Sequence, residues 1–425
     1  MKDSHRGFGS VERLPVKARQ FAGLAILLLV GLIIVAIKLR PSSDPVPQVP
    51  SILTAPVNGI IGGKAAFLQD PDVIKILNEK YGLTVNFTTV GSIEQIDRCA
   101  AGLDYCWPSS QTAGELIQRK FAANPVKSEI IFNSPIVLYT WAPIADALIA
   151  QGIVEKTGDA YYVVNFPKLI QMIGNGVAWK DIGLPQLYGK VIVFSSDPTH
   201  SNTGNSFAGL LANTLNSGHV VDDSSAAAVL PQVEAIFARM GLLPNTTTQL
   251  FEQFLALGMG AAPIIVAYES NLVEYGLRHQ TPTDKAIIGQ PVRTLYPKPT
   301  VWSSQPLIAL TAGGERLMAA LRDPEIQRLG WERHGFRSAV SGVPNNPNAV
   351  GQQDVPASID SVIQMPRAAV MERIIIALQA TPTAAFWQAE AAPDDIASPP
   401  KLQLGEPPQS ARDSVVAQRP PASAL

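Results

Sequence analysis

The chain has 425 residues, of which 46% are hydrophobic and 16% are charged, and its formal net charge is −2. This length is enough for one large or two medium domains in addition to a membrane segment and two tails. The basic residues number 33 and the acidic residues 35, so the chain has no basic field for nucleic acid or an anionic membrane surface. A nucleic-acid partner is therefore not expected.

The first predicted element is a membrane-spanning helix. Residues 21–37, FAGLAILLLVGLIIVAI, carry no charge, and flanking residues extend them to an anchor at 21–40 that can cross a bilayer core. A cleaved signal peptide is the alternative, but no small-x-small cleavage site and no cysteine for lipidation follows. Residues 1–20 are richer in Lys and Arg than the other flank, which predicts a cytoplasmic N-terminus. The bulk of the chain is then periplasmic, on a single-pass inner-membrane anchor.

Two proline-rich segments frame the globular part. Residues 41–50 contain four prolines and are predicted to form an extended spacer. Residues 381–425 contain few aliphatic clusters and are predicted to be a disordered tail. Between the globular part and this tail lies a C-terminal extension, 346–380, whose run PRAAVMERIIIAL at 366–378 predicts an amphipathic helix. This helix either packs on its own domain or binds a partner.

The globular part alternates short apolar runs with amphipathic stretches, as is typical of α/β folds, and its first half repeats strand, turn and helix three times, which predicts a parallel sheet with helices on its faces. The first half predicts strands at Ile52–Val57, Leu83–Val90 and Asp104–Trp107, with a helix at 64–80 that is broken near Asp70-Pro71 and another that opens at Gly91-Ser92. The second half predicts a strand at Lys190–Phe194, a loop at 195–205, a helix at Ser206–Leu215, a strand at Ala262–Tyr268 and a helix at Ser270–Tyr275. Two α/β units are the simplest account of this pattern.

Two long β-rich runs, Ile130–Trp141 and Arg293–Trp302, lie where the chain would pass between these units. They predict two hinge crossings that join lobe 1, residues 51–137 plus 300–345, to lobe 2, residues 138–299. A ligand cleft between the lobes is the natural expectation for this arrangement.

Four polar turns occur where a predicted strand feeds a helix. They are Gly62-Gly63-Lys64, Pro108–Gln111, Ser195–Ser206 and Tyr268–Asn271. Ligands of open α/β sheets bind beyond the carboxyl ends of the strands, and helix N-termini with hydroxyl side chains attract anions. Any single Ser, Thr or Asn in such a turn is also explained by helix capping. The twelve-residue run SSDPTHSNTGNS exceeds the needs of one cap and predicts a binding loop.

The only two cysteines, Cys99 and Cys106, are seven positions apart. In an oxidising compartment they can form a disulfide that closes a short loop. The alternative is two unrelated buried thiols. Metal binding is disfavoured because no histidine lies near them in the sequence.

The motifs together resemble the type II periplasmic substrate-binding proteins, which include phosphate-, sulfate- and molybdate-binding proteins. The resemblance covers roughly residues 51–338. It rests on Gly62-Gly63-Lys64, Trp107–Gln111 (WPSSQ), the 195–206 loop, Ala262–Asn271 (APIIVAYESN) and the closing stretch Trp331–Arg337 (WERHGFR). It implies a two-lobed α/β clamp that closes on a small solute, here preceded by one transmembrane helix.

The resemblance implies a set of ligand-binding residues at the cleft. An acidic Glu269 there would repel an oxyanion unless it is paired with Lys64 or Arg98. The implied residues are Gly63, Lys64, Ser109, Ser110, Ser195, Thr203, Gly204, Asn205, Tyr268 and Glu269.

The sequence therefore predicts a membrane-tethered, extracytoplasmic solute-binding protein that clamps a small molecule or anion for transport or sensing, with a transporter as its partner. The alternative is a ligand-free interaction module of a membrane complex. An enzyme is not predicted, nor is a cofactor or a metal site, because the five histidines show no metal-binding spacing. A His200–Ser206 nucleophile pair is the one catalytic arrangement that the sequence leaves open.

Overall fold

The computed structural model describes residues 56–157, 161–278, 291–350 and 355–380. The predicted cytoplasmic segment 1–20, anchor 21–40, spacer 41–50 and tail 381–425 lie outside the described residues. Among the described residues, no helix is long and apolar enough to cross a membrane.

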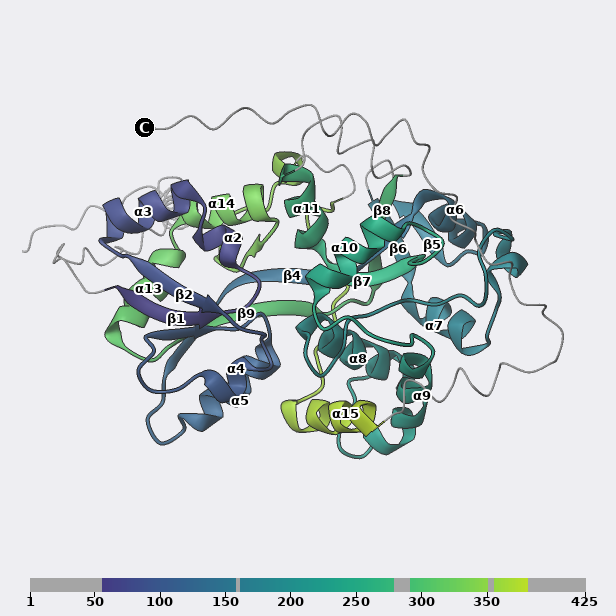
Figure 1. The fold of residues 1–425 in the computed structure, drawn as a ribbon, viewed down its shortest axis with the longest axis horizontal. Helices are drawn as coiled ribbons and strands as arrows, with labels where there is room; N and C mark the ends of the chain where they lie inside the picture. The colour runs from purple at the N-terminus through teal and green to yellow at the C-terminus, as the bar shows by residue number, and fades with distance from the viewer. Residues whose placement is uncertain (1–55, 158–160, 279–290, 351–354, 381–425) are drawn as a thin grey trace, which may run out of the picture.

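One sheet is built mainly from the first third of the chain (Figure 1). Its strand order is β2-β1-β3-β9-β4, and a short strand, β10, pairs with β4. The first three strands are parallel, while β9 and β4 run antiparallel to their neighbours. The parallel arrangement predicted from the repeated strand-turn-helix pattern is confirmed. The strands are β1 (Val57–Ile61), β2 (Val85–Thr89), β3 (Tyr105–Trp107), β4 (Lys127–Trp141), β9 (Trp302–Ala309) and β10 (Arg337–Ser338).

Helices cover both faces of this sheet, and an apolar cluster lies under each group. The larger cluster packs Phe67, Trp107 and Phe132 against the helices of one face. The predicted break near Asp70-Pro71 is confirmed because Asp70 caps the second helix and Pro71 occupies its first position, where no N–H is needed. The larger cluster contains residues of α2 (Ala65–Leu68), α3 (Pro71–Tyr81), α13 (Ala312–Leu321) and α14 (Pro324–His334), and the opposite face carries α4 (Gln95–Arg98) and α5 (Gln111–Lys120).

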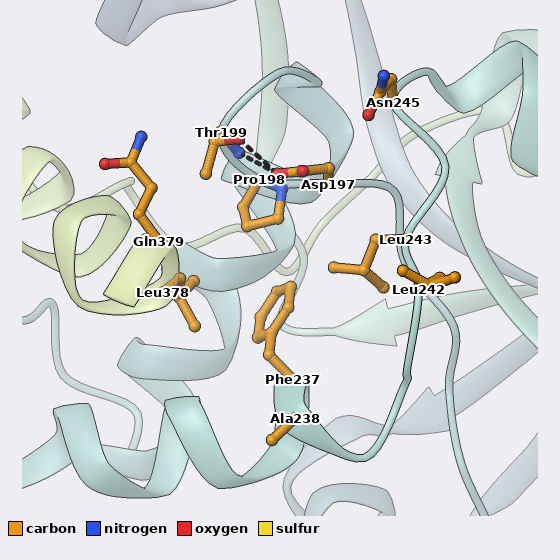
Figure 2. Close-up of a pocket in the computed structure, with 10 residues that line it drawn as sticks. All are labelled: Asp197, Pro198, Thr199, Phe237, Ala238, Leu242, Leu243, Asn245, Leu378 and Gln379. Atoms are coloured by element: carbon orange, nitrogen blue, oxygen red, sulfur yellow. Dashed lines mark hydrogen bonds between the residues drawn. The ribbon is translucent and has the colours of Figure 1, made fainter. Parts of the chain in front are cut away.

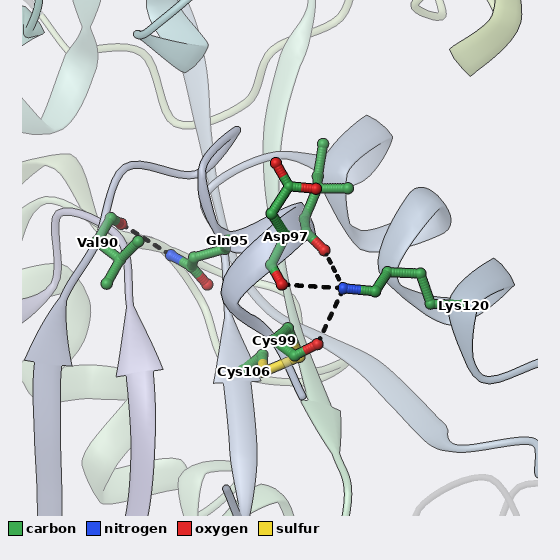
Figure 3. The surroundings of a disulfide bond; sticks show 7 residues. Val90, Gln95, Asp97, Cys99, Cys106 and Lys120 are labelled. Atoms are coloured by element: carbon green, nitrogen blue, oxygen red, sulfur yellow. Dashed lines mark hydrogen bonds between the residues drawn. A yellow bond between two sulfur atoms is a disulfide. The ribbon is translucent and has the colours of Figure 1, made fainter. Parts of the chain in front are cut away.

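The Cys99–Cys106 disulfide joins the end of α4 to β3, as the spacing predicts (Figure 3). Both cysteines are fully buried in the smaller apolar cluster. Lys120 of α5 donates to the backbone oxygens of Asp97 and Cys99 at 3.1 and 3.2 Å. The closed loop contributes about 2–3 kcal/mol by the chain-entropy model, and it fixes the connection between two neighbouring strand-to-helix turns.

The second sheet continues from the other half of β4. There β4 lies between β7 and β8, and β8 pairs in parallel with β6, which is followed by β5. One large apolar cluster fills this part of the molecule. Its strands are β5 (Val154–Thr157), β6 (Tyr161–Asn165), β7 (Ile264–Tyr268) and β8 (Val292–Lys298), and its helices are α6 (Ala142–Ala150), α7 (Phe166–Gly174), α8 (Asn202–Leu215), α9 (Ala226–Ala238), α10 (Thr247–Leu257) and α11 (Glu269–Arg278).

Several element boundaries differ from the sequence expectations. Residues 190–194 form only an isolated bridge at each end. Val191 and Val193 are buried, but they do not join a continuous ladder. The run 293–302 divides into β8 and β9, since its prolines cannot donate to a ladder. The helix expected from Ser206 already begins at Asn202, and the helix opened by Gly91-Ser92 is only four residues long.

Within the described residues, three extended segments pass between the two halves of the molecule, where two were predicted. β4 is the first, and residues 299–301 between β8 and β9 are the second. The third is the C-terminal extension: Thr300 N donates to Ser361 O at 3.0 Å, and Ile363 N donates to Thr300 O at 2.8 Å. Thr300 Oγ1 also donates to Ile136 O of β4 at 2.7 Å. The third segment therefore adds backbone hydrogen bonds at the point where the chain passes between the sheets.

The extension ends in α15 (Ala368–Ala380), which packs on α8 and α9 and also contacts α5 (Figure 1). Val370, Met371, Ile374 and Leu378 join the large apolar cluster. Of the two roles that the sequence allows this helix, packing on its own chain is the one observed.

This packing predicts different costs for the same substitution at two positions of α15. Ile374 is 0% exposed, whereas Ile376 is 58% exposed. Ile374→Val should lower the free energy of unfolding by about 1 kcal/mol, since it leaves a small cavity. Ile376→Val should stay within about 0.5 kcal/mol of the parent. Denaturant unfolding of both variants measures the difference, and equal effects would contradict the observed orientation of the helix.

Candidate functional site

The candidate site lies where α8 of the second half meets the turn after β3 of the first half. The side chain of Asn202, the first residue of α8, donates to Ser109 O at 2.5 Å and to the Tyr268 hydroxyl at 2.8 Å. Ser303 of β9 also donates to Ser109 O, at 2.7 Å. Polar groups from α8, β7, β9 and the β3–α5 turn are thus in direct contact.

The N-termini of two long helices point into this contact. Ser110 caps α5, and its hydroxyl accepts from Ala113 N. The N-cap position of α8 is Ser201, which makes no side-chain capping bond. The positive ends of the two helix dipoles are therefore brought together from opposite halves of the chain, an arrangement that favours a negatively charged ligand.

Lys64 is linked to this contact through Ser109. Its amine donates to Ser109 Oγ at 2.7 Å and lies 5.1 Å from the centre of the Trp107 ring. The residue is 1% exposed, and burial lowers the pKa of the amine well below its usual range. Gly62 makes this approach possible, since a side-chain carbon there would stand 2.7 Å from Ser109 Oγ.

The loop predicted from SSDPTHSNTGNS folds into a buried cluster of hydroxyl groups. Ser196 donates to Ser201 Oγ at 2.8 Å, and Thr247 of α10 contacts the hydroxyls of both Ser201 and Thr203. Asn205 is 4% exposed, and within the described part of the chain its Oδ1 has no hydrogen-bond partner. An unsatisfied buried acceptor is costly, so this oxygen marks a place where a donor is missing.

The structure brings together only part of the residue set implied by the resemblance. Lys64, Ser109, Ser110 and Tyr268 lie at or beside the contact around Asn202. Thr203, Gly204 and Asn205 belong to the first turns of α8 rather than to a loop. Ser195 bonds within its own loop, to Ser196 O. Gly63 is exposed and stands beside open space.

Glu269 requires a correction. From the sequence, Glu269 was expected to repel an oxyanion unless it paired with Lys64 or Arg98, but its partner is Arg337 of β10. Arg337 Nε and Nη2 lie 2.8 and 2.7 Å from its carboxylate oxygens. Arg98 instead pairs with Glu94 at the surface. Glu269 and Arg337 are 1% and 3% exposed. The guanidinium of Arg337 therefore neutralises the Glu269 carboxylate in a buried ion pair, and the carboxylate is not an unpaired negative charge.

Sequence reasoning missed three polar contributors to the site. Asn202 lies inside the predicted loop, but its position at the start of a helix was not evident. Ser303 follows the β-rich run 293–302, and the sequence does not indicate which residues Ser303 would contact. Thr247 starts α10, where the sequence indicates an amphipathic helical run before Gly258 but not where that run begins. The capping pattern around Thr246, whose hydroxyl accepts from Gln249 N, could have indicated the start of that helix.

The catalytic arrangement left open by the sequence is not formed. His200 contacts Thr199 and Asp197, at 2.8 and 3.2 Å, whereas Ser206 is buried within α8. The described residues also contain no group of three His, Cys, Asp or Glu side chains placed to hold a metal ion.

Two cavities occur in the second half of the molecule, and neither is lined by Ser109, Asn202 or Tyr268. One, of about 390 Å³, is enclosed by the 197–199 turn, α9 and the end of α15 (Figure 2). A second, of about 480 Å³, lies between α7 and α9. Direct hydrogen bonds between the two halves occupy the candidate site itself, so a ligand would have to replace some of them.

No family model and no curated protein matches the chain. Solved structures that resemble it include a Trichodesmium protein in complex with iron and citrate ligands, at 14% identity and a TM-score of 0.49, covering 76% of this chain and 98% of that one. The sulfate-binding protein SubI of Mycobacterium tuberculosis matches at 15% identity and a TM-score of 0.46, covering 75% of this chain and 96% of that one. The apo ferric ion-binding protein A of Pasteurella haemolytica matches at 12% identity and a TM-score of 0.48, covering 76% of this chain and 97% of that one. Similarities of this size assign no ligand.

Proposed function

We propose that the protein is an extracytoplasmic solute-binding protein that holds a small oxyanion between its two lobes, residues 51–137 plus 300–345 and residues 138–299. The observation that carries the proposal is the meeting of two helix N-termini, those of α5 and α8, at the Ser109–Asn202 contact. Donor groups aimed at one point from both sides suit an anion. Lys64 supplies an amine beside the same point.

The direct contact between Ser109 and Asn202 represents the closed arrangement of the lobes in this proposal. A bound oxyanion would take the place of Ser109 O as acceptor for the Asn202 amide. It would also accept hydrogen bonds from the first turn of α8, which has no side-chain cap. Closing the cleft would then depend on the ligand joining donors from the two lobes.

The uncharged segment 21–37 supports a membrane tether at 21–40, with the lobes in the periplasm and a transporter or sensor as partner. Residues 41–50 would act as a short spacer, so that the cleft stays close to the membrane. The disulfide observed between Cys99 and Cys106 agrees with an oxidising compartment.

A ligand screen tests the proposal. Full-length protein in detergent is heated with sulfate, phosphate, molybdate or citrate, and separately with amino acids, sugars or metal salts, with chloride as the baseline. An oxyanion at a hundredfold its Kd should stabilise the fold by about 2.7 kcal/mol. If none of the oxyanions raises the unfolding temperature, the proposal fails.

A pair of asparagine variants on α8 serves as the matched control. Asn202→Ala removes the donor at the start of the helix, and the response to the oxyanion should disappear. Asn216→Ala alters the other end of the same helix, where the side chain bonds only to His219 O at the surface. That variant should retain the full response.

The second candidate function is a ligand-free interaction module of a membrane complex. The direct hydrogen bonds from Asn202 to Ser109 and Tyr268 favour it, because protein groups from the two halves satisfy one another at this contact. The face of α15 that could have bound a partner is instead covered by α8 and α9. A negative result with every solute in the screen would support this candidate.

A further inference from the structure

Lys64 is a buried cation whose amine has a single polar contact among the described residues, the hydroxyl of Ser109 at 2.7 Å. No described carboxylate lies within ion-pair distance of its amine. A buried ammonium normally has such a partner, because the cost of removing a charge from water is large. The site therefore contains an amine that can carry a positive charge, but no described carboxylate balances that charge.

The titratable groups on neighbouring elements are already engaged. Asp70, the N-cap of α3, contacts two residues of α14. Its carboxylate oxygens lie 2.9 Å from Arg333 Nη1 and 3.3 Å from His334 Nε2. On the side of α11, Glu269 is bound by Arg337. None of these acids is available to balance a charge on Lys64.

Tyr268 accepts from Asn202, and its own burial raises its pKa, which keeps the phenol neutral. Trp107 presents only a ring face to the amine. The groups that surround Lys64 thus provide hydroxyls and a ring, and the missing anion is left for the ligand to supply.

We propose that Lys64 takes up one proton when an oxyanion enters the site, so that binding of the ligand and protonation of the amine are coupled. This inference rests on the proposed function. Without a ligand the amine loses its proton readily, since burial without a counter-charge lowers the pKa of Lys64. An oxyanion next to the amine favours the charged form and raises that pKa again.

The coupling fixes the direction of the pH dependence. Between the pKa of the ligand-free site and the higher pKa of the bound site, the complex holds one more proton than the free protein. Affinity therefore falls by up to about tenfold for each unit of rising pH in that interval. Below the ligand-free pKa the amine is already charged, and affinity stops depending on this group.

The test is isothermal titration of full-length protein with sulfate and with molybdate, in two buffers that differ in ionisation enthalpy. Both anions stay fully deprotonated at alkaline pH, so any proton taken up goes to the protein. Measured at several pH values above neutral, the heats should differ between buffers by an amount that approaches one proton per anion. The affinity should fall over the same pH range.

Three lysine variants assign the proton. Lys64→Met removes the amine but keeps a chain of similar length, and it should bind more weakly without proton uptake. Lys64→Arg keeps a permanent charge and should bind without uptake. Lys180→Met alters an exposed lysine of the other half and should retain both binding and uptake.

Each result bears on one of the two proposals. Binding by the parent without proton uptake overturns the coupling and leaves the solute-binding function in place. Uptake that persists in Lys64→Met assigns the proton to another group and also overturns it. If neither anion binds the parent, and the oxyanion screen is negative as well, both the function and the coupling fail.

Discussion

Arg337→Met should lower the free energy of unfolding by about 3–5 kcal/mol, because it leaves the Glu269 carboxylate buried without a counter-charge. Arg337 makes three hydrogen bonds to Glu269 and two more to the backbone oxygens of Pro356 and Ala357. Its guanidinium also lies 5.0 Å from the Trp331 ring centre. A single side chain therefore connects α11, β10 and the start of the C-terminal extension.

Denaturant unfolding measures this loss, and a double-mutant cycle isolates the pair. The variant with both Glu269→Met and Arg337→Met should lose less than Arg337→Met alone, since no buried charge remains. Arg328→Met is the control, because Arg328 pairs with Glu332 on the exposed side of α14 and should cost less than about 1 kcal/mol. If Arg337→Met costs no more than this control, the pair does not connect the two halves as described.

Gly204→Ala is expected to have the second large effect, a loss of about 2–3 kcal/mol. A side-chain carbon at this position of α8 would meet Ser196 O and would stand 2.7 Å from Pro198 N. Both are backbone atoms of the 195–201 turn and cannot rotate away. The turn would have to move, and with it the hydroxyls of Ser196 and Ser201 that bond to each other.

Thermal unfolding without the oxyanion measures the stability of the variant, and the shift on adding the oxyanion measures its response to the ligand. Gly204→Ala should lose stability and also the response to the ligand, since α8 can no longer keep its place beside Ser109. Gly63→Ala is the matched control, because open space adjoins Gly63, and its stability should stay within about 0.5 kcal/mol of the parent. Parent-like stability in Gly204→Ala would contradict the close packing of the turn on the helix.

These variants define two separate requirements of the molecule. Glu269 and Arg337 connect the two halves on one side of the contact, and the turn against Gly204 positions donors within it. Lys64 differs from both, because its burial without a described counter-ion opposes folding, and we propose that a bound anion supplies the counter-charge. Substitution at Arg337 would then test stability, substitution at Lys64 would test binding, and substitution at Gly204 would change both.

Local signals predicted most elements in the first half of the fold, although the first strand was expected at Ile52–Val57 and β1 is Val57–Ile61. Asp70 before Pro71 is a capping signal that needs no tertiary information, and it placed the helix break correctly. The strand-turn-helix repeat predicted that the first three strands run parallel to one another, but it did not predict their order in the sheet. The run at 190–194 was misassigned because a buried apolar segment has the same pattern whether or not it joins a ladder.

The sequence by itself determined which turns carry hydroxyls and glycines, that the two cysteines can form a disulfide, and that the chain alternates between strands and helices. These properties depend on neighbouring residues. Only the tertiary structure decided that Glu269 pairs with Arg337, 68 positions away, and that Asn202 reaches Ser109, 93 positions away. Such pairings depend on how the sheets bring distant segments together, and no local propensity encodes that distance. The tertiary structure likewise decided that the amine of Lys64 is buried beside Ser109 with no carboxylate near it.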